Sequence, residues 1–124
     1  SVVSMFNEDV EKWLNQAEIR YTPSVTFKGK SGYDQFFDFV VPASKQAPER
    51  IIKTVNRPTK DKAQNLVFAW IDIKEVRKPD SRAYAVLNDT DYPISPGILD
   101  ALHKYDIEPL KWSLREEMQA ELVK

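Results

Sequence analysis

The sequence predicts a single α/β or α+β domain in which helices pack on a mixed sheet of about five strands. Its 124 residues suit one domain and can bury a sizeable core without disulfides, since the chain has no cysteine. A continuous apolar run at residues 66–71 predicts a strand covered on both faces. Helical and strand-like segments alternate, which predicts the order αββαββαβα over residues 1–124.

The first third of the chain predicts a helix followed by a hairpin. Apolar residues at helical spacing indicate the helix, with Ser4 or Asn7 as its cap: Phe6, Val10, Trp13, Leu14 and Ala17. Residues 24–28 alternate as in a half-buried strand, and residues 33–41 form a second one. The intervening Gly29-Lys30-Ser31-Gly32 predicts a hairpin turn, because a phosphate-binding loop would need glycine where Ser24 stands and a helix afterwards.

The middle of the chain predicts a helix and then the spine of the sheet. Pro48 opens a helix that ends at Asn56, with Ile51, Ile52 and Val55 facing inward. Residues 66–73 form the central strand, which a short turn joins to a further strand at residues 83–87. The carboxyl end of the central strand is where open α/β sheets usually bind ligands.

The last third predicts a helix, an edge strand and a closing helix. Ser95 is the cap and Pro96 the first residue of a helix, in which His103 is an ordinary surface or boundary residue. Residues 107–112 form a strand that Pro109 confines to the edge of the sheet. A capping box at residues 113–116 opens the C-terminal helix.

Charge is unevenly distributed along the chain. The net charge is −1, yet residues 45–82 hold ten Lys or Arg and five Asp or Glu. This basic middle predicts a surface that contacts the phosphates of DNA or RNA, although a merely solvated surface would have the same composition. The predicted phosphate-contacting residues are Lys53, Arg57, Lys60, Lys62, Arg77 and Arg82.

Two carboxylates provide a second candidate site. Asp38 lies within an apolar strand, where it needs a cation, a basic partner or backbone amides. Asp72 and Lys74 point the same way from the end of the predicted central strand. Asp38 and Asp72 are therefore candidate metal ligands and, with Lys74, candidate catalytic residues; the alternative is a surface ion-pair cluster of Asp72 and Lys74 with their charged neighbours.

Asp38 followed by Asp72-Ile73-Lys74 is similar to the signature of the restriction-endonuclease-like (PD-(D/E)XK) superfamily. That similarity implies a Mg²⁺-dependent nuclease, in which the carboxylates hold the cation and the lysine favours hydroxide. Outside this alternative, the sequence predicts no cofactor.

A closer resemblance covers nearly the whole chain. It rests on Phe27-x-Gly29-Lys30-Ser31-Gly32, residues 37–42, Pro48-Glu49-Arg50-Ile51-Ile52, Asn56-x-Pro58, Phe68-Ala69-Trp70-x-Asp72, Arg77, residues 87–89 and Trp112-Ser113-x-Arg115-Glu116. These motifs resemble a bacterial and prophage family that carries this unit as the C-terminal domain of a two-domain protein without established function. The resemblance implies a mobile-element setting and an N-terminal domain as a partner, and the chain begins at Ser1, as a domain cut from a longer protein would.

No apolar run reaches the roughly 18 to 20 residues of a membrane span, so we expect a cytoplasmic protein without a membrane partner. The sequence favours an accessory binding or interaction domain that contacts nucleic acid or a host protein. The alternatives are the nuclease and a structural or oligomerisation domain.

Overall fold

The computed structural model describes residues 2–124, with side chains from Met5 onward. The elements follow one another as α1 (Val2–Gln16), β1 (Thr22–Lys28), β2 (Asp34–Val41), β3 (Arg50–Val55), α2 (Lys60–Lys74), β4 (Arg82–Leu87), α3 (Pro96–Lys104), β5 (Ile107–Lys111), the 3-10 helix η1 (Trp112–Met118) and α4 (Gln119–Leu122). No helix in this described part is long and apolar enough to cross a membrane.

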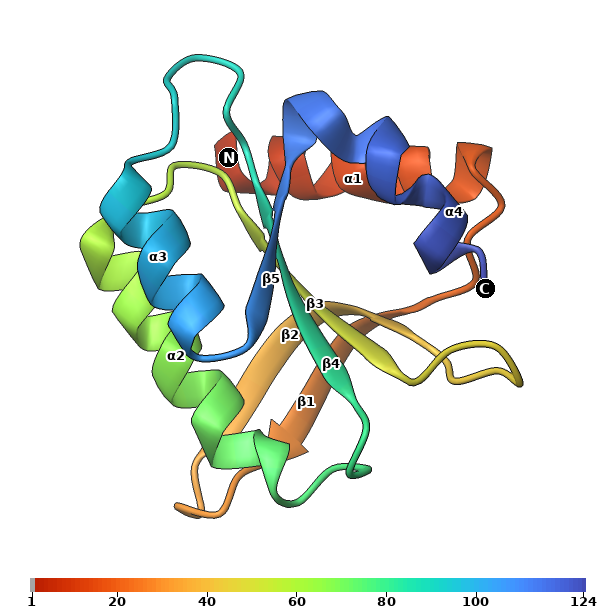
Figure 1. Ribbon diagram of the computed structural model, residues 1–124, viewed down its shortest axis with the longest axis vertical. Helices are drawn as coiled ribbons and strands as arrows, with labels where there is room; N and C mark the ends of the chain where they lie inside the picture. The colour runs from red at the N-terminus through yellow and green to blue at the C-terminus, as the bar shows by residue number, and fades with distance from the viewer. Residues whose placement is uncertain (1) are drawn as a thin grey trace.

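The five strands form one mixed sheet in the order β1-β2-β3-β4-β5. Strands β1, β2 and β3 are antiparallel neighbours, whereas β3, β4 and β5 run parallel and are joined through α2 and α3. Helices α2 and α3 cover one face of the sheet, and α1 lies with η1 and α4 on the other (Figure 1). The predicted fold class, a single domain with a mixed five-stranded sheet, is confirmed.

The predicted central strand at residues 66–73 is wrong, because this segment is part of helix α2. The helix begins after Thr59, whose side chain accepts a hydrogen bond from the Lys62 amide, and its buried apolar positions are at helical spacing: Ala63, Leu66, Trp70 and Ile73. Phe68 and Ile71 lie on the outer face, where each is about half exposed (50% and 48%). Because these exposed residues are apolar too, the run resembles a strand buried on both faces.

The predicted helix from Pro48 to Asn56 is also wrong, because Arg50–Val55 forms strand β3. Ile51 belongs to the apolar cluster under α2 and α3, whereas Ile52 belongs to the cluster under α1, so the strand is covered on both faces. Three of its six residues, two isoleucines and a valine, are β-branched and apolar, which favours such a strand. Strands β3 and β4, rather than residues 66–73, form the buried centre of the sheet.

The other predicted elements are confirmed with shifted ends. Helix α1 begins at Val2, so Ser4 and Asn7 lie inside it instead of capping it. Strand β5 is an edge strand that includes Pro109, as predicted. The C-terminal helix predicted from Ser113 is instead the 3-10 helix η1 followed by the single turn of α4.

Candidate functional site

Asp72 lies in the last turn of α2 and holds the β1–β2 hairpin against that helix. Its side chain accepts hydrogen bonds from the Ser31 amide (2.7 Å), the Ser31 hydroxyl (2.6 Å) and the Gln35 amide group (2.9 Å). The hydroxyl of Ser31 foremost, with the Gln35 and backbone donors, keeps the pKa of Asp72 below its ordinary value although burial opposes this. Gly29 lies so close that any Cβ there would overlap the carboxylate. Asp72 therefore fixes the hairpin predicted at Gly29-Lys30-Ser31-Gly32.

Asp38 lies where β2 separates from β3. The last paired residues are Phe39 and Ile52, and beyond them the Asp38 carboxylate accepts the Thr54 amide at 2.8 Å. Asn7 of α1 donates to the other Asp38 oxygen at 3.0 Å and to the Thr54 hydroxyl at 3.2 Å. The regular alternation of side chains along a strand breaks here, because Phe37 and Val40 share one apolar cluster whereas Phe39 and Val41 share the other. Asp38 thus satisfies a backbone group that the sheet leaves unpaired.

The two carboxylates are not brought together. Asp38 is bonded to α1 on one face of the sheet, whereas Asp72 belongs to α2, which covers the other face. Among the described residues, no group of three or more His, Asp or Glu side chains is placed to hold a metal ion. The third predicted catalytic residue, Lys74, pairs with Asp106 at 3.2 Å.

The predicted basic surface divides into two separate groups. Lys53, Arg57, Lys60 and Lys62, here called the basic rim, lie at the carboxyl end of β3, the connection that follows it and the first turn of α2. Arg77 and Arg82 lie beyond the far end of α2 and at the start of β4.

Of the distant pair, Arg77 binds inside the fold through its side chain. The Arg77 guanidinium binds buried Glu49 through two hydrogen bonds, of 3.2 and 2.7 Å, and lies 4.5 Å from the centre of the Phe27 ring. Ser81 donates to the same carboxylate at 3.0 Å, and the Arg82 amide donates to the Glu49 carbonyl oxygen. Arg77 is therefore an internal partner of Glu49, half of a bidentate pair.

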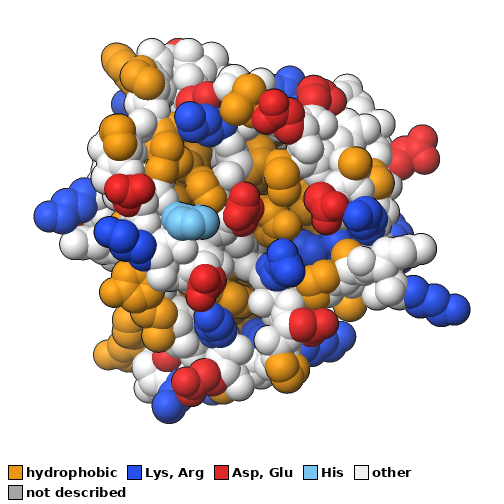
Figure 2. All heavy atoms as spheres, in the orientation of Figure 1, with side chains coloured by type: hydrophobic (Ala, Val, Ile, Leu, Met, Phe, Trp, Pro, Cys, Tyr) orange, Lys and Arg blue, Asp and Glu red, His pale blue; other side chains and the backbone are white. Residues whose placement is uncertain are grey.

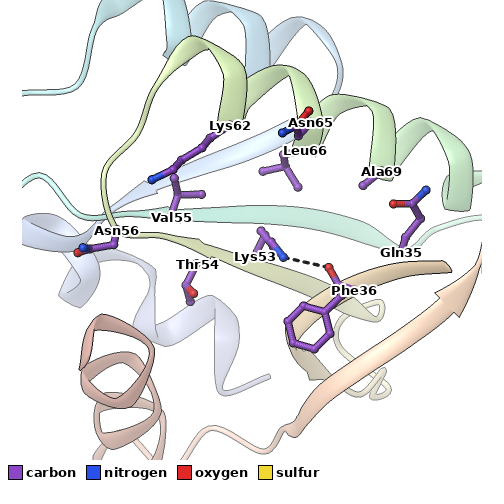
Figure 3. Close-up of a pocket in the computed structure, with 10 residues that line it drawn as sticks. All are labelled: Gln35, Phe36, Lys53, Thr54, Val55, Asn56, Lys62, Asn65, Leu66 and Ala69. Atoms are coloured by element: carbon purple, nitrogen blue, oxygen red, sulfur yellow. Dashed lines mark hydrogen bonds between the residues drawn. The ribbon is translucent and has the colours of Figure 1, made fainter. Parts of the chain in front are cut away.

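A pocket of about 380 Å³ opens where β2 and β3 separate beneath α2. We call it the β2–β3 pocket. Lys62 and Asn65 approach it from α2, while Gln35 and Phe36 lie on the β2 side (Figure 3). Its lining consists of Gln35, Phe36, Lys53, Thr54, Val55, Asn56, Lys62, Asn65, Leu66 and Ala69.

The lining of this pocket is basic and amide-rich. Among the described residues it includes two lysines and three amide side chains but no carboxylate. Lys53 donates to the Phe36 carbonyl oxygen at 3.2 Å, and its ammonium lies 4.7 Å from the centre of the Phe36 ring. Because Gln35 donates its amide nitrogen to Asp72, its carbonyl oxygen remains on the pocket side (Figure 3). The arrangement can hold a ligand with negative charge and polar edges.

A family model described as "Domain of unknown function DUF1829" matches residues 29–115. The chain belongs to this family. The resemblance to a family of domains without known function is thereby confirmed. A search of curated proteins finds no match.

The DUF1829 match includes every residue of the β2–β3 pocket, while α1 and all of β1 lie outside the matched range. Sequence reasoning found the two lysines of the pocket but missed Gln35, Phe36, Asn56 and Asn65. One signal was present: a carboxylate inside an apolar strand indicates a place where regular pairing ends. Recognising that place required knowing that residues 50–55 form the neighbouring strand.

Proposed function

We propose that this domain is an accessory module that binds nucleic acid through the basic rim. The observation that carries the proposal is the grouping of four of the six predicted cations at one end of β3, beside a pocket whose described lining has no carboxylate. Between Arg50 and Ile71 the chain has a single acidic residue, Asp61. Phosphates need such uncompensated cations, since a lysine already paired with a carboxylate contributes little to binding.

The place of the basic rim in the fold also supports its role as the binding surface. Lys53 lies in the carboxyl-terminal half of β3, and open α/β sheets usually bind ligands outside the carboxyl ends of their strands. The amide groups at the start of α2 add positive potential at Lys60. A prophage setting, a partner N-terminal domain and a cytoplasmic location stay predictions of the sequence.

The test is fluorescence anisotropy with labelled single-stranded and double-stranded oligonucleotides at 50 and 200 mM salt. If four phosphates are neutralised, the affinity for a single strand should fall about 50-fold between these conditions. The double variant Lys60→Ala/Lys62→Ala should bind about tenfold more weakly at 50 mM salt and show a shallower salt dependence. Lys104→Ala, at the end of α3, is the matched control and should bind like the wild type. Absence of binding to either oligonucleotide at 50 mM salt would overturn the proposal.

The nuclease alternative stays a prediction with its own test. It expects Mg²⁺- or Mn²⁺-dependent cleavage that is lost in Lys74→Ala, the variant of the predicted water-activating lysine. Lys74 is about half exposed and its partner Asp106 lies on the surface, so this variant should remain folded. Circular dichroism confirms folding, and a folded wild-type protein that cleaves nothing with either metal would remove the alternative.

A further inference from the structure

The β2–β3 pocket exists because β2 turns away from β3 after Phe39. Beyond that point the Asp38 carboxylate, rather than a β2 carbonyl group, accepts the Thr54 amide. The space that a continuous sheet would close is thus kept open by a hydrogen-bonded side chain, which Asn7 supports from α1. A pocket maintained by such bonds is a built feature of the fold.

The lining of the pocket matches the chemistry of a nucleobase. Val55, Leu66 and Ala69 provide apolar contact of the kind that the flat face of a base needs. Asn65 provides an amide group that can donate to and accept from a polar edge, and Gln35 provides its carbonyl oxygen as an acceptor, since its nitrogen donates to Asp72. The volume of about 380 Å³ lies within the range of small-molecule sites.

Phe36 is one of the residues that line the pocket, and 45% of its surface is exposed. The Lys53 ammonium lies 4.7 Å from the centre of this ring, and an aromatic ring beside a cation suits a single strand, since a base can stack on the ring while the cation contacts a phosphate. The remaining cations of the basic rim extend this surface along the start of α2.

We propose that the β2–β3 pocket receives one unstacked base of a single-stranded nucleic acid, while a neighbouring base stacks on Phe36 and the backbone lies along the basic rim. This inference rests on the proposed function and names its substrate class. It predicts a preference for single strands, because the bases of a duplex are stacked and paired and cannot enter.

The experiment uses a short single-stranded oligonucleotide with one 2-aminopurine, moved position by position, and the same strand in a duplex. At one position, binding should raise the fluorescence of the probe several-fold, because the probe base leaves its stacked neighbours. Ala69→Leu, which places a larger side chain in the pocket, should abolish this rise and weaken single-strand binding about tenfold. Phe36→Ala should weaken single-strand binding to a similar extent, since stacking of one base on an aromatic ring accounts for such a change. Duplex affinity should change in neither variant.

The outcomes separate this inference from the proposed function. Suppose that Ala69→Leu and Phe36→Ala bind single strands like the wild type, and that Lys60→Ala/Lys62→Ala still binds weakly. The basic rim then binds nucleic acid, and the proposal that the β2–β3 pocket receives a base is wrong. If the wild-type protein binds neither form, the proposed function itself fails. Phe36 is exposed, so its variant tests the inference even if Ala69→Leu does not fold.

Discussion

Two hollows of similar size differ in how their charges are arranged. The β2–β3 pocket, of about 380 Å³, is lined by two lysines and, among the described residues, by no carboxylate. The hollow at the amino ends of β4 and β5, of about 450 Å³, combines Lys74 and Arg82 with three carboxylates: Asp106, Glu108 and Glu121. Figure 2 shows acidic and basic side chains interspersed around His103, which lines this second hollow.

The difference between the two hollows shows which lysine and arginine side chains are not already paired with a carboxylate and can contact a ligand. At the second hollow Lys74 pairs with Asp106, and nearby Arg77 is bound to Glu49, so these charges are compensated within the molecule. At the basic rim no ion pair is formed among the described residues. A basic stretch of sequence therefore contains both structural and ligand-accessible cations, and carboxylates close in space distinguish them.

The largest expected effect is on stability, from Glu49→Gln. The variant leaves Arg77 without the carboxylate that it binds bidentately in a largely buried site, which should lower the free energy of unfolding by about 3 kcal/mol. Urea denaturation measures this loss. Nucleic-acid affinity at a temperature where the variant is folded should be unchanged. A tenfold loss of affinity would show that the region around Arg77 belongs to the binding surface, which would contradict the contrast drawn between the two hollows.

An acid placed in the β2–β3 pocket should have the next largest effect. Asn65→Asp keeps the shape of the side chain but adds a carboxylate to the pocket lining, so the affinity for a single strand should fall about tenfold at 50 mM salt. Gln64→Glu is the matched control, because it adds the same charge one residue away, outside this pocket. Equal losses in both variants would indicate a general effect of net charge instead of a site.

The smallest expected effect concerns acid stability and Asp72. Since the folded pKa of Asp72 is depressed, this group stabilises the fold above its unfolded pKa of about 3.9, and the contribution is lost as pH falls through the folded pKa. The melting-temperature difference between the wild type and Asp72→Asn should therefore be constant near neutral pH and shrink below about pH 4. Asp89, whose pKa is also lowered, is present in both proteins and does not affect the difference. A difference independent of pH would contradict the assigned role of Asp72.

The sequence was sufficient for the fold class but not for the order of elements in the middle of the chain. Phe68 and Ile71 are apolar at exposed positions, so composition did not distinguish α2 from a buried strand. Pro48 resembled a helix start, although the isoleucines that follow it are buried on opposite faces of the sheet, as in a strand. These two errors exchanged one helix and one strand and left the class unchanged.

The candidate site was predictable only in part, for the same reason. Lys53 and Lys62 were identified by charge, but that both line one pocket depends on how β3 and α2 are placed. Asp72 was identified as a candidate metal ligand, yet its partners Ser31 and Gln35 belong to a distant hairpin that spacing along the chain does not reveal. The presence of a carboxylate in the sequence could not show whether it binds a metal ion or accepts hydrogen bonds that hold two elements of the fold together.

The most direct test of the central claim is a ¹⁵N–¹H NMR titration of the domain with a short single-stranded oligonucleotide at 50 mM salt. We expect amide shifts to change around the β2–β3 pocket and the basic rim, at residues 35–36, 53–57 and 60–69, while Glu49, Arg77 and Arg82 stay unchanged. Changes centred on Arg77 and Arg82, or no changes at a saturating concentration, would contradict the account.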